Sequence, residues 1–109
     1  HGVFASRSST IEANNVNASG AGEHGIYANQ TSTIDAWGAD ASGAGGHGVY
    51  ANQASIINAI SVNARKGEVD SAEDIYAVNG SIIKISSTLT IGGTNQATNT
   101  LTRNGIIFS

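Results

Sequence analysis

The chain has 109 residues, 14 of them glycine, with 12 % charged residues, a formal net charge of −3, and no proline, cysteine or methionine. The lack of cysteine excludes disulfides and cysteine-based metal sites, and five basic residues in an acidic chain argue against nucleic acid, because phosphate binding needs clustered positive charge. No apolar run approaches the ~18 residues that a membrane-spanning helix needs, so we expect no membrane insertion.

The first three segments of the chain are copies of one another. They begin at His1, His24 and His47, so the spacing is 24−1 = 23 and again 47−24 = 23, with no insertion. Self-similarity at a fixed period of this length is typical of solenoid proteins. A leucine-rich repeat is excluded, because the only leucines, Leu89 and Leu101, lie beyond the copies.

Each copy consists of three short runs of alternating character, separated by glycine, asparagine and serine. In the second copy these runs are residues 25–28, 32–36 and 39–41. Alternation with a period of two indicates strands with one buried face. We therefore predict an all-β protein in which each copy forms one triangular coil of a parallel β-helix with three strands.

The alternation also predicts which side chains point inward. The inward positions are aliphatic in every copy, and two of them are always alanine. Coils stacked about 4.8 Å apart would fill a narrow core in layers. The expected inward columns are Val3, Ile26 and Val49; Ile11, Ile34 and Ile57; Val16, Ala39 and Val62; Ala13, Ala36 and Ala59; and Ala18, Ala41 and Ala64.

The sequence begins at the first residue of a repeat, with no polar cap before it. An uncapped coil exposes a strand edge that can pair with another chain. We therefore expect these 109 residues to be a piece of a longer chain, with more coils or another domain upstream.

Beyond the third copy the repeat continues after an insertion. Charged residues collect in residues 65–73, and residues 74–77 then repeat the pattern of residues 48–51, with the offset enlarged to 76−50 = 26. Solenoids accept such insertions at a corner, where they form a loop. The sequence therefore predicts about four coils, at residues 1–23, 24–46, 47–73 and 74–87.

From residue 88 the repeat is lost. Residues 88–91, 100–103 and 105–108 have strand patterns, separated by turn residues. This non-repetitive β tail, residues 88–109, is expected to close the helix as a cap or to exchange strands with neighbouring chains. Its apolar residues would be costly to leave in water and favour a partner; they are Leu101, Ile106, Ile107 and Phe108.

The repeated patterns G-[IV]-Y-A, S-T-I-D-A and A-S-G-A in residues 1–87 resemble the right-handed β-helix stems of bacteriophage tailspikes and neck appendages, in the pectin-lyase-like group. The tail resembles the C-terminal trimer-locking regions of such spikes more loosely. The resemblance implies a homotrimer locked by the tail, a place on a virion tail where upstream residues join other tail proteins, and binding or cleavage of a host surface polysaccharide.

Two structural points accompany this resemblance, namely whether one chain or three form each coil, and the handedness of the coil. Three chains can wind together into an intertwined triple β-helix, but the alternation of isoleucine and alanine on separate sides of one coil favours the single-chain form. Right-handedness follows from the resemblance and from the general preference of parallel connections.

One outward column is aromatic and consists of Phe4, Tyr27, Tyr50 and Tyr76. Rings at coil spacing can stack against the sugars of a polysaccharide, or they can pack against a neighbouring subunit, where aromatic residues are enriched. We favour the subunit interface, because four exposed rings in a row form a large apolar patch for a monomer. Trp37 has no aromatic counterpart, since Asn14 and Ile60 hold its place, and is either a corner anchor or an interface residue.

A second outward column carries carboxylates. Glu12 lies one coil before Asp35, with Asn58 and Lys84 continuing the column. Two acids on adjacent coils would lie near the ~5 Å separation of a retaining glycosidase. Any two acids at one repeat position would meet this distance, so we favour a solvated polar face. No acid in an apolar pocket accompanies them, and we assign no catalytic residue.

The histidines form a third column at a corner, with Glu73 in the equivalent place of the fourth coil. Neutral imidazoles about 4.8 Å apart can share a metal. A corner ladder before a glycine is more often a solvated or hydrogen-bonded stack. We therefore expect no metal and no other cofactor.

The sequence thus predicts a rigid trimeric stem on a virion tail that helps to attach the virion to a host surface polysaccharide. A polysaccharide depolymerase, either a hydrolase or a lyase, is the enzyme alternative, and it would need an acidic cleft that only the insertion 65–73 could help to build. A passenger coil of an adhesin on a bacterial cell surface is the third alternative, and it would be a monomer.

Overall fold

The computed structural model of the chain describes residues 1–64, 75–85, 100–102 and 106–108. All the regular secondary structure in these ranges consists of β-strands, so the predicted all-β class is confirmed. The strands are β1 (Val3–Ala5), β2 (Thr10–Glu12), β3 (Ile26–Ala28), β4 (Thr33–Asp35), β5 (Val49–Ala51), β6 (Ile56–Ala59), β7 (Ile75–Val78), β8 (Ile82–Ile85), β9 (Thr100–Thr102) and β10 (Ile106–Phe108).

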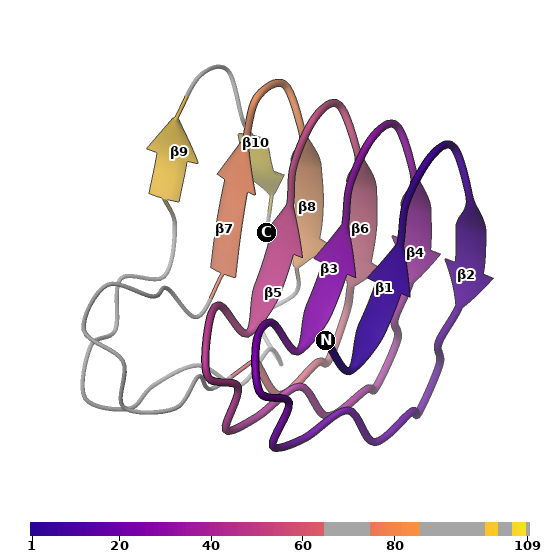
Figure 1. Ribbon diagram of the computed structural model, residues 1–109, viewed down its shortest axis with the longest axis vertical. Coiled ribbons are helices and arrows are strands. Elements are labelled where there is room, and N and C mark those ends of the chain that lie inside the picture. The colour runs from indigo at the N-terminus through magenta and orange to yellow at the C-terminus, as the bar shows by residue number, and fades with distance from the viewer. Residues whose placement is uncertain (65–74, 86–99, 103–105, 109) are drawn as a thin grey trace.

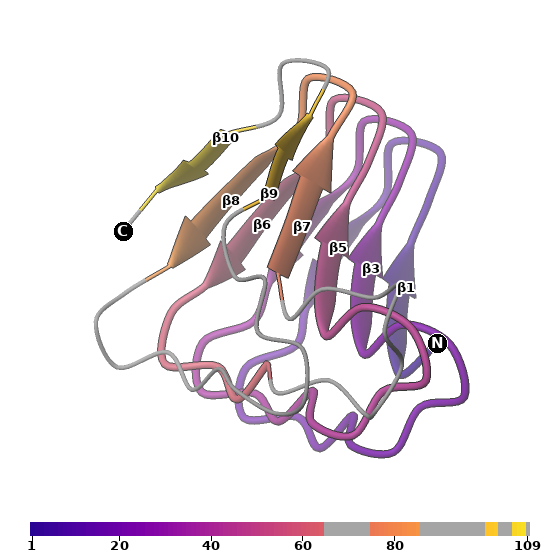
Figure 2. The same cartoon turned by 90° about the vertical axis from the view of Figure 1, so that its left-hand side faces the viewer.

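The strands form two parallel sheets that face each other (Figure 1). The first sheet has the order β1-β3-β5-β7-β9, and the second has the order β10-β8-β6-β4-β2. Each turn of the chain contributes one strand to each sheet, and the turns advance in a right-handed sense (Figure 2). The predicted right-handed parallel β-solenoid is therefore confirmed.

The register between turns follows the sequence period. Tyr27 pairs with Phe4 on one side and with Tyr50 on the other, each of them exactly one repeat away along the chain. Tyr50 pairs with Tyr76, so the three inserted residues leave the fourth turn in register. The predicted loop at residues 65–73 lies outside the described part of the chain.

The third side of the coil differs from the prediction. Where a third strand was expected, Asp40 forms only isolated parallel bridges with Asn17 and Asn63. The Oδ1 atoms of Asn17 and Asp40 accept the backbone N–H groups of Ser19 and Ser42, each at 3.0 Å. Such side-chain acceptors turn the backbone away from a strand, so the cross-section has two strands and a bridged third side.

The core is a stack of aliphatic columns between the two sheets. The side chains of Ile26, Ile34 and Ile57 are fully buried, and burial of each contributes roughly 1.5–3 kcal/mol. Val16 and Ile11 were expected to be inward, but Val16 is 37 % exposed and Ile11 is only partly buried. Both belong to the first turn of the described residues, and among these residues only the second turn packs against it.

A column of buried serines lies at the start of the second sheet. The Oγ atoms of Ser32, Ser55 and Ser81 accept the backbone N–H groups of Ser9, Ser32 and Ser55, at 3.2, 3.1 and 3.1 Å respectively. Burying a hydroxyl is costly unless it is hydrogen-bonded. Here each hydroxyl satisfies a backbone donor of the preceding turn, which fixes the register of the turns.

Two strands of the tail continue the sheets. In parallel pairs, β9 lies beside β7 and β10 beside β8, so the tail strands stack as a further layer although their sequence is not a copy of the repeat (Figure 2). The strand expected at residues 88–91 lies outside the described part of the chain. The trimer contact expected of Leu101, Ile106, Ile107 and Phe108 concerns side chains outside that part and stays a prediction, as does the boundary at residue 87.

Candidate functional site

The aromatic column stands on the outer face of the first sheet. Phe4, Tyr27, Tyr50 and Tyr76 come from β1, β3, β5 and β7, and their consecutive ring centroids are 5.0, 4.7 and 5.3 Å apart. The planes of Tyr27 and Tyr50 differ by only 4°, and those of Tyr50 and Tyr76 by 32°. The rings therefore form one continuous stack along the solenoid.

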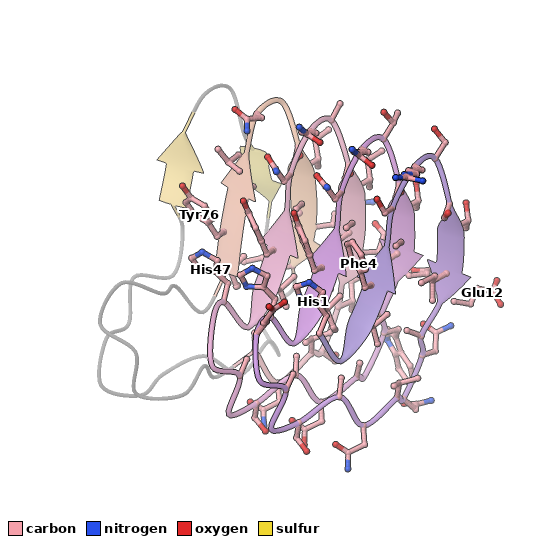
Figure 3. All side chains as sticks on the ribbon, viewed as in Figure 1. His1, Phe4, Glu12, His47 and Tyr76 are labelled. Carbon is pink, nitrogen blue, oxygen red and sulfur yellow. The ribbon has the colours of Figure 1, made fainter. Side chains whose placement is uncertain are left out.

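The histidine column runs beside it on the same face, as His1 and Phe4 at one end and His47 and Tyr76 at the other show (Figure 3). The imidazole of His24 lies 5.3 Å from that of His1 and 5.1 Å from that of His47, between ring centroids, with nearly parallel planes. The Nδ1 atom of His1 accepts the backbone N–H of His24 at 3.4 Å, and Nδ1 of His24 accepts that of His47 at 3.0 Å. The structure thus shows a hydrogen-bonded stack.

The two columns touch each other along their length. The ring centroid of His24 lies 5.0 Å from that of Tyr27 and 4.8 Å from that of Tyr50, in edge contacts. His47 stacks against Tyr76 with 4.6 Å between ring centroids. We call the whole set the aromatic double column; it consists of His1, His24, His47, Phe4, Tyr27, Tyr50 and Tyr76.

A glycine after each histidine lets the corner close beneath these rings. A Cβ atom added to Gly25 would lie 2.7 Å from Cβ of Ala41 and 2.7 Å from the carbonyl oxygen of Gly48. No side chain fits between these groups. The invariant His-Gly pair of the copies therefore serves the packing of the corner, which the sequence pattern alone did not reveal.

The double column is uncharged at neutral pH near its centre. Burial, with the nearby charge of His47, lowers the pKa of His24 from 6.5 to about 4, although Glu23 acts in the opposite direction. Burial also raises the pKa of Tyr50, and the neighbouring phenols of Tyr27 and Tyr76 add to this shift. The central groups are therefore neutral rings.

The stacking determines which parts of the rings are left for a ligand. The faces of Tyr27 and Tyr50 are covered by their neighbours in the column, whereas Phe4 is 45 % exposed. Sugars stack on ring faces, so an extended polysaccharide would find only ring edges along most of the column. Ring edges suit the close packing of another protein surface better.

The carboxylate column is in register but does not form a cleft. Glu12 pairs with Asp35 and Asp35 with Asn58, and Asn58 pairs with Lys84. Glu12 is exposed and projects away from the second sheet (Figure 3). In the described ranges, the residues enclose no pocket and include no group of three or more metal-binding side chains.

Two further apolar side chains are exposed. Trp37 is 53 % exposed, and its backbone N–H donates to Oδ1 of Asn14 at 2.9 Å, so the backbone is anchored while the ring faces solvent. Sequence reasoning did not single out Ile56, which is 40 % exposed on β6 beside Ile82 of β8. The signal was available, because Thr10 and Thr33 hold the same outward column in the earlier copies.

Within the described residues, no helix has the length and apolar character needed to cross a membrane.

Comparisons of the chain with protein-family models, with curated proteins and with solved structures gave no match.

Proposed function

We propose that the chain is a structural and receptor-binding segment of a bacteriophage tailspike or tail fibre. In this proposal it forms a rigid stem that assembles into a homotrimer through the aromatic double column and helps to attach the virion to a host surface polysaccharide. The double column on the outer face of the first sheet is the observation that supports the subunit contact. The phage origin is supported by the resemblance of the repeats to tailspike stems.

The backbone bonding supports the role of a stem. Consecutive turns are joined in both sheets, and they are also joined on the third side, where the N–H of Asp40 donates to Val16 at 2.9 Å and the N–H of Ala41 donates to Asn63 at 2.7 Å. Hydrogen bonds on every side of the turn resist bending and shear. A solenoid of this kind is a stiff rod whose side-chain columns stay aligned.

The chemistry of the double column supports a protein partner. Aromatic residues are enriched in the cores of interfaces, and a continuous apolar row on a monomer usually marks such a contact. The equivalent outer face of the second sheet carries the charged residues Glu12, Asp35 and Lys84, and its exposed apolar side chain, Ile56, belongs to no aromatic row. The first sheet is therefore the face we place against the other subunits.

A depolymerase is the weaker proposal for this segment. It would need converging acids in a cleft, and the described residues offer a surface row instead. An adhesin passenger coil would use the same fold as a monomer, so the oligomeric state separates it from the trimeric stem.

The location of the contact can be tested with two double variants of the chain. Tyr27→Ser with Tyr50→Ser removes the two central rings, and Asp35→Ser with Asn58→Ser makes matched changes on the outer face of the second sheet. Sedimentation at equal concentration should show a trimer for the unaltered chain and for the second variant, and a monomer for the first. A first variant that remains trimeric, or a second that alone dissociates, would exclude the aromatic face as the contact.

A further inference from the structure

The hydrogen bonds of the histidine column fix the protonation state of its members. The Nδ1 atom of His24 accepts the backbone N–H of His47 at 3.0 Å. A ring nitrogen accepts a hydrogen bond only when it carries no proton, and both nitrogens of an imidazolium are donors. This bond therefore exists only while His24 is neutral.

The ring of His24 is packed on one side against the main chain of the next turn. A Cβ atom at Gly46 would lie 2.7 Å from Nδ1 and 2.9 Å from Cε1 of His24, so the imidazole is packed against the Gly46 backbone. Glu23 occupies the equivalent position one turn earlier, and there the corresponding bond from His24 to His1 is longer, at 3.4 Å. The tight corner at Gly46 holds His24 in its accepting orientation.

Charged and titratable groups surround His24 within the column and along its edge. The imidazoles of His1 and His47 flank that of His24 in the column, and Tyr27 and Tyr50 meet its edge. The carboxylate of Glu23 lies 2.9 Å from Nε2 of His1. Glu23 therefore stabilises a positive charge on the outermost imidazole more directly than on the central one.

We propose that the histidine column is an acid-sensitive clasp, in which protonation of His24 breaks its bond to His47 and opens the aromatic double column. The proton binds Nδ1, which turns from an acceptor into a donor facing the N–H donor of His47. Positive charges then develop on imidazoles stacked 5.1 to 5.3 Å apart. This clasp depends on contacts within one chain, so it goes beyond the proposed assembly and does not require it.

The direction of the titration agrees with this geometry. The packed column holds the pKa of His24 at about 4, below its ordinary value of 6.5. Acid therefore favours any state in which His24 is released to water. The clasp is closed at neutral pH and opens as the pH falls between these two values.

The test combines a pH titration with two asparagine variants. In His24→Asn, Oδ1 takes the place of Nδ1 and can accept the His47 N–H without titrating; His1→Asn makes the same change at the outermost ring. Near-ultraviolet circular dichroism should show that the tyrosine signal of the unaltered chain and of His1→Asn is lost in acid, and that His24→Asn keeps it. Equal acid loss in the unaltered chain and in His24→Asn would overturn the proposal.

A second measurement remains decisive if His24→Asn does not fold. The pKa of His24 in the unaltered chain can be measured by NMR from the chemical shifts of its ring. A value well below 6.5, with loss of the His47 amide hydrogen bond over the same pH range, supports the clasp. A value at or above that of a free histidine contradicts it, whether the chain is monomeric or trimeric.

Discussion

Nδ1 of His24 accepts the backbone N–H of His47 at 3.0 Å, so a side chain in one turn binds the main chain of the next. The buried serine column uses the same device in the opposite direction, since Oγ of Ser55 accepts the N–H of Ser32 at 3.1 Å. Both columns join turns at corners just before the strands, and they add to the backbone hydrogen bonds there. The corners are therefore the places where single substitutions should have the clearest effects.

Replacing Ser55 by alanine should destabilise the fold. The change removes the acceptor of a buried N–H group, and an unsatisfied buried donor costs about 1–3 kcal/mol. Urea unfolding should show this loss in the free energy of unfolding. Ser42→Ala, at a half-buried corner position whose hydrogen bonds to Asp40 and Gly20 are made by its backbone, should stay within about 0.5 kcal/mol of the unaltered chain. Equal effects of the two changes would contradict the role of the serine column.

Gly25→Ala should also destabilise the fold. Its new Cβ would lie 2.7 Å from Cβ of Ala41, and overpacking of this kind typically costs about 1–3 kcal/mol. Gly22→Ala is the matched control, because an added Cβ there meets no atom within 4 Å. Thermal unfolding should show a lower midpoint temperature for Gly25→Ala and an unchanged one for Gly22→Ala. An unchanged midpoint for Gly25→Ala would show that the corner can widen.

The tight turn between β5 and β6 offers a stabilising change. Gln53 and Ala54 both have positive φ angles, 53° and 58°, and the left-handed conformation costs a residue with a side chain roughly 1–2 kcal/mol. The fourth turn has Asn79 and Gly80 there. Ala54→Gly should therefore stabilise the chain by up to about 1 kcal/mol after the entropy of glycine in the unfolded state is deducted.

The control for this change is an alanine in a regular strand. Ala51→Gly, at a fully buried position in β5, removes a packed methyl group and should destabilise the chain. Chemical unfolding should show a higher free energy of unfolding for Ala54→Gly and a lower one for Ala51→Gly. A loss of stability in Ala54→Gly would mean that the strain at this turn is negligible.

Stability should fall in mild acid because of His24. Its pKa is 6.5 when unfolded and about 4 in the fold, so between these values the unfolded chain binds more protons. The contribution of neutral His24 to the free energy of unfolding is complete above pH 6.5. It declines as the pH falls, and it is lost once the pH is below about 4. The slope should lie below the ~1.4 kcal/mol per pH unit of one full proton, because the half-exposed ring is screened by solvent. Unfolding at a series of pH values measures the slope, and a flat profile over this range would contradict the shift.

The fixed period of the repeat was enough to predict which side chains pair. It placed Tyr27 beside Tyr50 and Ile34 beside Ile57, because parallel strands related by a repeat keep one register. It did not reveal the bridged third side, since the competition between the Asp40 side chain and a strand ladder depends on a local turn. The low pKa of His24 could not be predicted either, because it arises from ring packing across turns.

The solution molar mass of the chain, measured by light scattering, tests the proposed stem most directly. Our account predicts the mass of three chains at pH 7, because the aromatic double column needs a partner surface. The mass of a single chain, 11.0 kDa, would contradict the trimeric stem and would favour an adhesin-like coil or a glycan-binding face.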